Sequence, residues 1–410
     1  MAADRYTVPY LPAGSTFGPA EIEAVARVLQ SGNKLSCGPE RDAFENEFAA
    51  YAGARHALTL TNCTIALEFA TYLLDLQPGD EVIAATQTYQ ANVTPLLGTP
   101  ARVRFCDVDP ETLNVSPDAF ASLINDRTRA LYLVHHGGTP ADMDPIMKVA
   151  GESSISVVED CAHALGARYY GRSPGTLGNF GCWSFQSYKN ISTLGEGGML
   201  TVADDHHAEV IRRIRAIEPD ADFERRAEPP FPGLLPPADD VERHAKNAYD
   251  DDCTVLRHPG TNSTLSEPAA AVGRVQLRRL DALVARRREI ADRLDSGLGS
   301  IAGIRIQPRR PGIDSGHHLY TFFLDGAAGI DRDSFIARLD SLGIQIQLRY
   351  FPVHLLPEWR LRDHHLGECP IAERIWFHEQ VNLPIYPQMH DWQVDFMIET
   401  VHKTMREFAT

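Results

Sequence analysis

The chain of 410 residues lacks the features that mark disulfide-rich, zinc-stabilised or membrane proteins. Its seven cysteines are an odd number and include no C-x-x-C pair, which argues against a disulfide framework and a structural zinc site. No apolar run reaches the length of about 18 residues that a membrane-spanning helix needs. The first residues also lack a basic region followed by an apolar stretch, so we expect a cytosolic protein with no membrane partner.

Positive charge is also in short supply. The 39 lysines and arginines are outnumbered by 55 acidic residues, which gives a formal net charge of −16. Such a field repels polyanions, so nucleic acid is not an expected partner. Any phosphate site must therefore be built locally.

The first half of the chain alternates short apolar runs with helical patterns. This alternation predicts an α/β fold with a mostly parallel sheet that has helices on both faces. Ligands of such sheets bind beyond the carboxyl ends of the strands, where Thr61, Asp160 and His135 are expected. The predicted strands are residues 56–60, 81–85, 101–105, 130–134 and 155–160.

The second half of the chain differs in composition and in its pattern of predicted elements. Residues 218–252 are rich in proline and acidic side chains, which predicts an irregular excursion. A long helical pattern over residues 266–298 then leads into a smaller C-terminal α/β domain. We therefore predict a large domain over residues 1–252, and a bridging helix with a small domain over residues 253–410. The small domain is expected to hold strands near 304–306, 320–324 and 344–348, and helices near 332–342 and 392–408.

Lys189 is the candidate catalytic lysine of the sequence. Lys189 lies between a run typical of a buried strand and the glycine turn of residues 195–198, and Asp160 ends another predicted strand. A lysine amine that can form a Schiff base, with an acid that can keep a pyridine nitrogen protonated, is the minimum equipment for pyridoxal 5′-phosphate (PLP) chemistry.

Several motifs in order along the chain resemble the DegT/DnrJ/EryC1/StrS family of PLP-dependent sugar aminotransferases. They are residues 31–45, 140–144, 159–163, the segment around Lys189, and residues 383–387. Each motif is weak alone, but their order and spacing together are specific. The resemblance implies the PLP-dependent transferase fold type I, which is aspartate-aminotransferase-like, and a homodimer with shared active sites.

The resemblance implies that the cofactor phosphate binds where residues 61–64 enter a helix. Cys63 and Thr64 would hold it there, with the hydroxyl of Ser184. Relatives usually carry glycine at the position of Cys63, so this side chain either turns away from the phosphate or reshapes the loop. From the residues alone, an ordinary threonine N-cap before the helical run that begins at Ile65 is the simpler interpretation.

The other implied contacts surround the cofactor ring. Lys189 would form the Schiff base and then carry a proton, with a pKa lowered by burial. Asp160 would hold the pyridine nitrogen, His163 would lie beside the 3′-oxygen, and Tyr89 would stack on the ring. Taken alone, Asp160 can be explained as a helix N-cap. A histidine such as His163 is more often structural, and an aromatic ring such as Tyr89 is most often packed in the core or a loop.

Two further segments bear on substrates. Asn262 aligns with a family asparagine that reaches the PLP phosphate of the neighbouring subunit. The arginine that usually follows it two positions later is Thr264 here, which puts the usual donor contacts in doubt because threonine cannot replace a bidentate cation. Residues 349–354 resemble a family segment that lies near the substrate mouth, which would make His354 a substrate contact, although packing is its better explanation.

Other chemistries are less well supported. The histidine doublets at 135–136, 317–318 and 364–365 have no metal-ligand spacing, so no metal is expected. The glycines at 171, 175, 178 and 181 do not form the G-x-G-x-x-G pattern of a nicotinamide site.

The sequence therefore predicts an aminotransferase. An amino acid, glutamate or glutamine, would convert PLP to pyridoxamine 5′-phosphate, which would aminate a keto group of a nucleotide-linked sugar or a ketocyclitol in antibiotic or saccharide biosynthesis. A sugar 3-dehydratase of the same fold remains an alternative, although those relatives usually replace the lysine. A non-catalytic PLP- or sugar-binding regulator is another.

Overall fold

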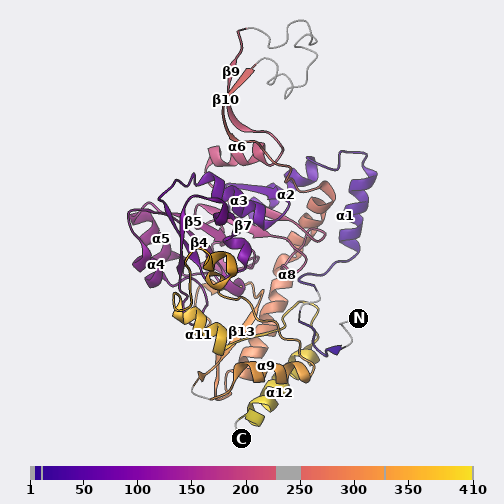
Figure 1. Ribbon diagram of the computed structural model, residues 1–410. Helices are drawn as coiled ribbons and strands as arrows, with labels where there is room; N and C mark the ends of the chain where they lie inside the picture. The colour runs from indigo at the N-terminus through magenta and orange to yellow at the C-terminus, as the bar shows by residue number, and fades with distance from the viewer. Residues whose placement is uncertain (1–4, 11–12, 228–250, 327–328, 409–410) are drawn as a thin grey trace. The chain divides into compact units, whose positions relative to one another are not determined.

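A computed structural model describes residues 5–10, 13–227, 251–326 and 329–408 (Figure 1). The chain divides into two compact units, which we describe separately. The larger unit comprises residues 1–203 and 265–410, and the smaller one comprises residues 204–264. None of the described helices combines the length and apolar composition that crossing a bilayer requires.

The larger unit contains a seven-stranded sheet (Figure 1). Strands β2, β3, β4, β5 and β7 pair in parallel, and β8 is antiparallel to both of its neighbours, which confirms a mostly parallel α/β fold. In spatial order the strands are β1 (His56–Leu60), β8 (Gly198–Val202), β7 (Phe180–Ser184), β5 (Ser156–Asp160), β4 (Thr128–Val134), β2 (Glu81–Ala85) and β3 (Arg102–Cys106).

Helices cover both faces of this sheet, as the alternating pattern predicted. On one face lies α3 (Cys63–Leu73), where the Thr71 hydroxyl is 2.7 Å from the Tyr132 hydroxyl of β4. The opposite face packs in two apolar clusters against α2 (Pro39–Ala52), α4 (Pro117–Leu123), α5 (Met143–Glu152) and the long helix α8 (Glu267–Leu298). Because side chains alternate along a strand, neighbouring residues of β5 serve different faces.

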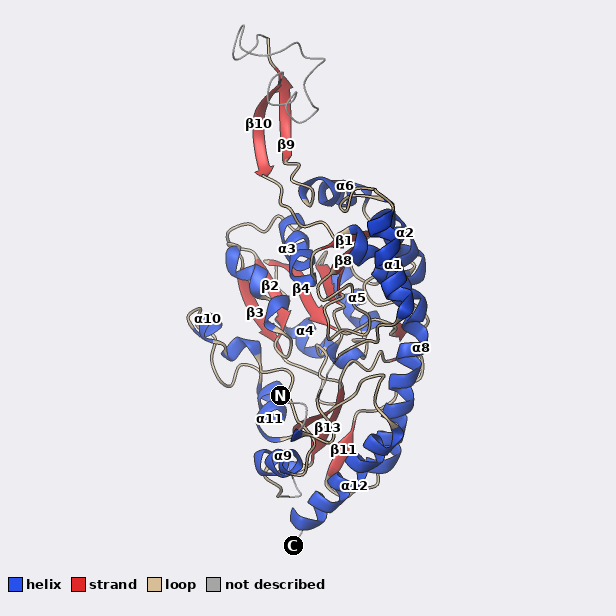
Figure 2. Cartoon of the chain, turned by 90° about the vertical axis from the view of Figure 1, so that its right-hand side faces the viewer, coloured by secondary structure: helices blue, strands red, loops and turns tan. Residues whose placement is uncertain are grey.

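Helix α8 links this sheet to the C-terminal part of the same unit. It contacts α1 and α2 near its start and α12 further along (Figure 2). A three-stranded antiparallel sheet, β11 (Ile304–Ile306), β13 (Tyr320–Leu324) and β14 (Gln380–Leu383), shares a separate apolar core with α8. The helices around it are α9 (Arg332–Ser341), α10 (Pro357–Arg360), α11 (Pro370–His378) and α12 (Asp391–Phe408).

The remaining elements of the larger unit are short or peripheral. They are α1 (Pro19–Gln30), the paired strands β6 (Arg168–Tyr169) and β12 (Ile313–Asp314), and the 3₁₀ turns η2 (Gln90–Asn92), η3 (Thr94–Gly98), η4 (His136–Gly138) and η7 (Val353–Leu355). The predicted division at residue 252 stays a prediction.

The predicted strand over residues 344–348 is wrong. Ile344 makes a single parallel bridge to Val8, and no ladder follows. The backbone beyond it is satisfied by side chains instead: the Arg349 amide donates to Asn382 Oδ1 (2.9 Å), and the Arg349 carbonyl accepts from Gln380 Nε2. The alternation of apolar and polar residues over 344–348 alone could not distinguish this pairing from a strand.

The smaller unit corrects the predicted irregular excursion. It holds α6 (Asp205–Ile214) and an antiparallel hairpin of β9 (Asp220–Arg225) and β10 (Asp251–His258). The two strands are mostly exposed and are held by backbone pairing and cross-strand ion pairs, such as Arg226 with Asp252 at 2.6 Å. Their sequences therefore show no alternation of apolar and polar residues from which the strands could be predicted. The predicted excursion over residues 218–252 therefore begins with strand β9 and ends at the start of strand β10. Residues 228–250 lie outside the described residues.

Candidate active site

The first turn of α3 forms one wall of a cavity. The helix begins at Cys63, and the Asn62 side chain caps it by accepting a hydrogen bond from the Ile65 amide (3.0 Å). The N-cap is thus Asn62, the last extended residue before the helix, so the simpler interpretation of a threonine N-cap is wrong. Cys63 and Thr64 line the cavity at the positive end of the helix dipole, where an anion is favoured.

Strand β8 approaches this turn closely. An added Cβ at Gly198 would lie 2.3 Å from the Asn62 carbonyl carbon, which no side chain tolerates. Glycine at this position therefore allows β8 to pack directly against the backbone that precedes α3.

The pleat of β5 separates two adjacent carboxylates. Asp160 lines the same cavity as Cys63, and its Oδ1 accepts from the Ala162 amide at 3.0 Å. Burial raises the pKa of the Asp160 carboxyl above its ordinary value. Glu159 points to the opposite face of the sheet, so only Asp160 is available to a ligand.

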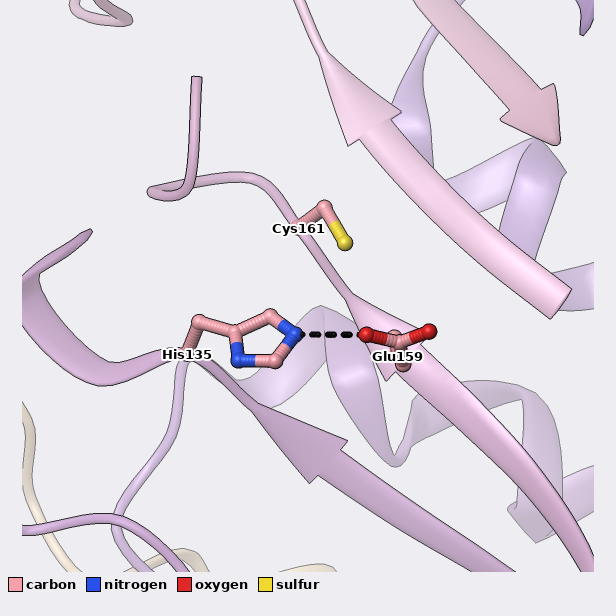
Figure 3. Close-up of side chains that lie close together, drawn as sticks. All are labelled: His135, Glu159 and Cys161. Atoms are coloured by element: carbon pink, nitrogen blue, oxygen red, sulfur yellow. Dashed lines mark hydrogen bonds and ion pairs between the residues drawn. The ribbon is translucent and has the colours of Figure 1, made fainter. Parts of the chain in front are cut away.

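Glu159 belongs to a closed hydrogen-bond network (Figure 3). Its Oε2 accepts from His135 Nε2 at 2.9 Å, and His135 Nδ1 accepts from the Ala141 amide at 3.0 Å. Three backbone amides also donate to Glu159, those of Gly175, Leu177 and Gly178.

Cys161 completes a buried group whose possible metal-ligand atoms lie within 4.8 Å of one another. Burial raises the pKa of its thiol well above the ordinary value, so it stays protonated. Because Glu159 and both His135 nitrogens already bond to protein groups, this cluster is explained as a structural network that stabilises the face of the sheet opposite the cavity. His135 does not line the cavity.

Lys189 follows β7 in a tight turn. Its amide donates to the Gln186 carbonyl at 2.8 Å, and its half-buried side chain lines the cavity that holds Asp160. Burial lowers the pKa of the Lys189 amine to about 8, since the charged form loses hydration. With this pKa, roughly a tenth of the amine is neutral and nucleophilic at pH 7, and about half is neutral at pH 8.

A stack of rings forms another wall. His163 Nε2 lies 2.9 Å from the Tyr350 hydroxyl, and the His163 ring stacks on His318 with centroids 4.3 Å apart. Burial holds the pKa of both histidines well below the ordinary value, so they are neutral. The Nδ1 atoms of both rings are buried with no hydrogen-bond partner among the described residues.

His317 and His318 project into different cavities. His318 lines the cavity of Lys189, whereas His317 lines a smaller one of about 130 Å³ beside Arg309. The doublet therefore offers no joint ligand site, as expected for adjacent residues. His318 is nevertheless a site residue that the sequence reasoning missed.

Cys63 and Tyr89 both line the cavity but differ in exposure. Cys63 Sγ lies 3.9 Å from Asp160 Oδ1, so its side chain turns toward the carboxylate. Tyr89 is 53% exposed, and its ring centroid lies 5.8 Å from that of Tyr350. An exposed aromatic ring at a cavity edge is free to stack on a ligand.

The cavity, of about 570 Å³, brings together seven of the eight predicted site residues: Cys63, Thr64, Tyr89, Asp160, His163, Ser184 and Lys189. Asn262 belongs to the smaller unit, where it bridges to Ala216, so its predicted role stays a prediction. His354 is fully buried and bonded to Glu373 at 2.9 Å, which favours packing.

Comparison with known proteins agrees with this geometry. The DegT/DnrJ/EryC1/StrS aminotransferase family matches residues 16–402. The chain belongs to this family. The spore coat polysaccharide biosynthesis protein SpsC of Bacillus subtilis is 33% identical over 395 residues, which are 95% of each chain.

Solved structures of DegT/DnrJ/EryC1/StrS relatives have the same fold. The aminotransferase TlmJ of Streptoalloteichus hindustanus superposes with a TM-score of 0.83 at 32% identity, covering 98% of this chain and 100% of TlmJ. Spr1654 of Streptococcus pneumoniae, described as a sugar aminotransferase and solved in a PLP form, gives 0.83 at 25% identity, with 99% and 100% covered. This chain is thus a PLP-dependent aminotransferase of fold type I.

The donor set in the cavity fits PLP. A helix start whose dipole favours an anion, a buried carboxylate and a lysine amine suit the phosphate, the pyridine nitrogen and the aldehyde of that cofactor. The unpartnered Nδ1 atoms of His163 and His318 are buried polar atoms that a ligand can satisfy. The residues present therefore suit the group that the family uses.

Proposed function

We propose that this chain transfers an amino group from glutamate or glutamine to a keto group of a nucleotide-linked sugar or a ketocyclitol. The observation that carries the proposal is the convergence of Lys189, Asp160 and the first turn of α3 on one cavity. Bound PLP would supply an electron sink for the carbanion formed at the donor Cα. We place this activity in cytosolic antibiotic or saccharide biosynthesis.

In this proposal Lys189 has two roles. Its neutral amine would hold the cofactor through the aldehyde carbon, and its Nζ would accept and release the proton that is moved during amino transfer. The pKa of about 8 for the cofactor-free chain suits both tasks, because Nζ accepts and releases protons near the working pH.

Other side chains hold and orient the cofactor. The amides of Cys63 and Thr64, with the Ser184 hydroxyl, would bind the phosphate, and Tyr89 would cover the ring. Asp160 would keep the pyridine nitrogen protonated, since a carboxylate held there stabilises the cationic ring. His163, neutral and bonded to Tyr350 at 2.9 Å, would contact the 3′-oxygen.

Reduction with borohydride followed by peptide mapping tests the central assignment. PLP should be trapped on Lys189, and the Lys189→Ala variant should hold PLP only noncovalently, without turnover. Label on another lysine would overturn the assignment.

Amino transfer is tested separately by adding glutamate or glutamine to the PLP-loaded protein. The long-wavelength absorbance should bleach, and a keto-sugar should restore it. Binding without bleaching would instead favour a non-catalytic binding protein, and water loss from the sugar would favour a dehydratase.

A further inference from the structure

We propose that Arg349 binds the carboxylate of the amino-acid donor and sets donor specificity. This inference rests on the proposed function. Among the described residues that line the cavity, Lys189 and Arg349 are the only side chains that carry a positive charge, given that His163 and His318 are neutral. Because Lys189 is engaged by the cofactor, Arg349 is the cation left for a second anion.

The guanidinium of Arg349 has no carboxylate partner among the described residues. Its side chain donates to neutral groups: Nη2 to Gln347 Oε1 at 2.8 Å, and Nη1 to the Tyr350 hydroxyl at a long 3.5 Å. A guanidinium has five N–H donors in a fork that matches a carboxylate, so most of its capacity is unused. Half-buried cations are usually paired, which makes this one suited to a ligand.

The position of Arg349 is fixed from several sides. Its backbone is tied to Asn382 and Gln380 of β14, and its guanidinium lies 5.5 Å from the Tyr10 ring centroid and 5.7 Å from that of Tyr350. Contact with aromatic faces orients the cation and limits its rotamers. A donor would thus meet a preorganised fork.

The location of Arg349 separates the donor carboxylate from the cofactor phosphate. The phosphate wall is the first turn of α3 with Ser184 of β7, whereas Arg349 sits with Tyr350, whose hydroxyl contacts His163.

Glutarate, a dicarboxylate without an amine, is the probe that tests this assignment in the PLP-loaded protein. We expect Arg349→Gln to weaken glutarate binding about tenfold or more, since a charge-assisted bidentate contact is lost. Arg349→Lys keeps the positive charge but not the forked donor geometry, so its affinity for glutarate should lie between those of the wild type and Arg349→Gln. The exposed Arg406→Gln is the matched control for net charge and should bind glutarate normally.

Three parallel measurements identify the anion that Arg349 holds. Retention of PLP on dialysis reports the cofactor phosphate, and titrations with uridine diphosphate and inorganic phosphate report a nucleotide-linked acceptor. The inference is supported if only glutarate binding falls and if the KM for the donor rises more than kcat drops. A loss confined to uridine diphosphate or to PLP retention overturns it.

The design also covers a variant that does not fold. Thermal unfolding identifies such a protein, and Arg349→Lys then carries the comparison alone; glutarate affinity equal to that of the wild type overturns the inference. Failure of the proposed function is distinct, because a wild type that never transfers an amino group refutes transamination whatever Arg349 does to glutarate.

Discussion

At the residue scale, the adjacent carboxylates Glu159 and Asp160 have opposite tasks because the strand pleat directs them to opposite faces. Asp160 meets the cavity, and Glu159 accepts four hydrogen bonds beneath the sheet. Conservative amide substitutions at the two positions should therefore fail in different ways.

Asp160→Asn should slow the donor half-reaction at least about a hundredfold, because a neutral amide does not stabilise a pyridinium. Its thermal unfolding should stay near that of the wild type. Stopped-flow absorbance with glutamate measures the rate, and a near-normal value would reduce Asp160 to a structural cap.

Glu159→Gln is the matched contrast. Its amide group would face backbone N–H donors, so we expect a loss of about 2 kcal/mol or more in the free energy of unfolding. Any folded fraction should keep its donor half-reaction within a few-fold. A stable but inactive variant would contradict the bracing role.

The pKa of Lys189 predicts how the cofactor-free protein captures PLP at different pH values. Burial lowers this pKa from 10.5 to about 8, so the neutral amine grows about tenfold per pH unit below 8 and then saturates. The rate of covalent capture should follow that curve from pH 6.5 upward and level off. The Lys189→Ala protein, which binds noncovalently, corrects for titration of PLP itself, and a rate still rising at pH 10 would mean an ordinary exposed amine.

Residues next to recognisable motifs were predictable, and residues brought in by the tertiary fold were not. Lys189 and Asp160 are marked by a glycine turn and a strand end within their own segments. His318, Tyr350 and Arg349 enter the cavity only because the C-terminal part packs against the sheet, which no local pattern encodes. Their nearest signal was the C-terminal segment that resembles the substrate mouth of relatives.

At the scale of elements, the cavity depends on how closely β8 approaches the start of α3. Gly198→Ala would place Cβ 2.3 Å from the Asn62 carbonyl carbon, so the strand or the helix start must shift. Because the phosphate is expected at this turn, we predict at least about tenfold weaker PLP retention, a size typical of a lost charged hydrogen bond.

Gly151→Ala provides the control for this substitution. Gly151 lies in α5, and nothing stands within 4 Å of an added Cβ, so alanine should stabilise the helix by about 0.5–1 kcal/mol and leave PLP retention unchanged. Equilibrium dialysis and thermal unfolding of both variants make the comparison. Equal PLP retention in the two variants would show that the close approach of β8 to the start of α3 plays no part in PLP binding.

Elements were predictable where their buried residues leave a pattern in the sequence, either a continuous apolar run or a helical period. The buried parallel strands read as continuous apolar runs, and α8 appeared at nearly its observed bounds. The β9–β10 hairpin was missed because its faces are almost entirely exposed and its stability comes from backbone pairing and charges. Such a ladder has no hydrophobic alternation to detect.

At the scale of the whole molecule, the net charge of −16 repels anions, so any anion site needs local positive charge. In the cavity that charge comes from the start of helix α3 and from the side chains of Lys189 and Arg349. The proposed homodimer would add Asn262 from the neighbouring subunit to each phosphate. Subunit exchange between two inactive variants tests that sharing.

Asn262→Asp should be inactive because it places a negative charge against the phosphate, and Lys189→Ala should be inactive because it lacks the amine. In a mixed dimer, one site would combine an intact Lys189 with an intact Asn262, and the other would carry both lesions. Random reassociation of equal amounts makes about half of the dimers mixed, so roughly one quarter of wild-type activity should return under twofold symmetry. If exchange is verified by mass and both variants fold and dimerise, no recovery means that Asn262 acts within its own subunit or not at all.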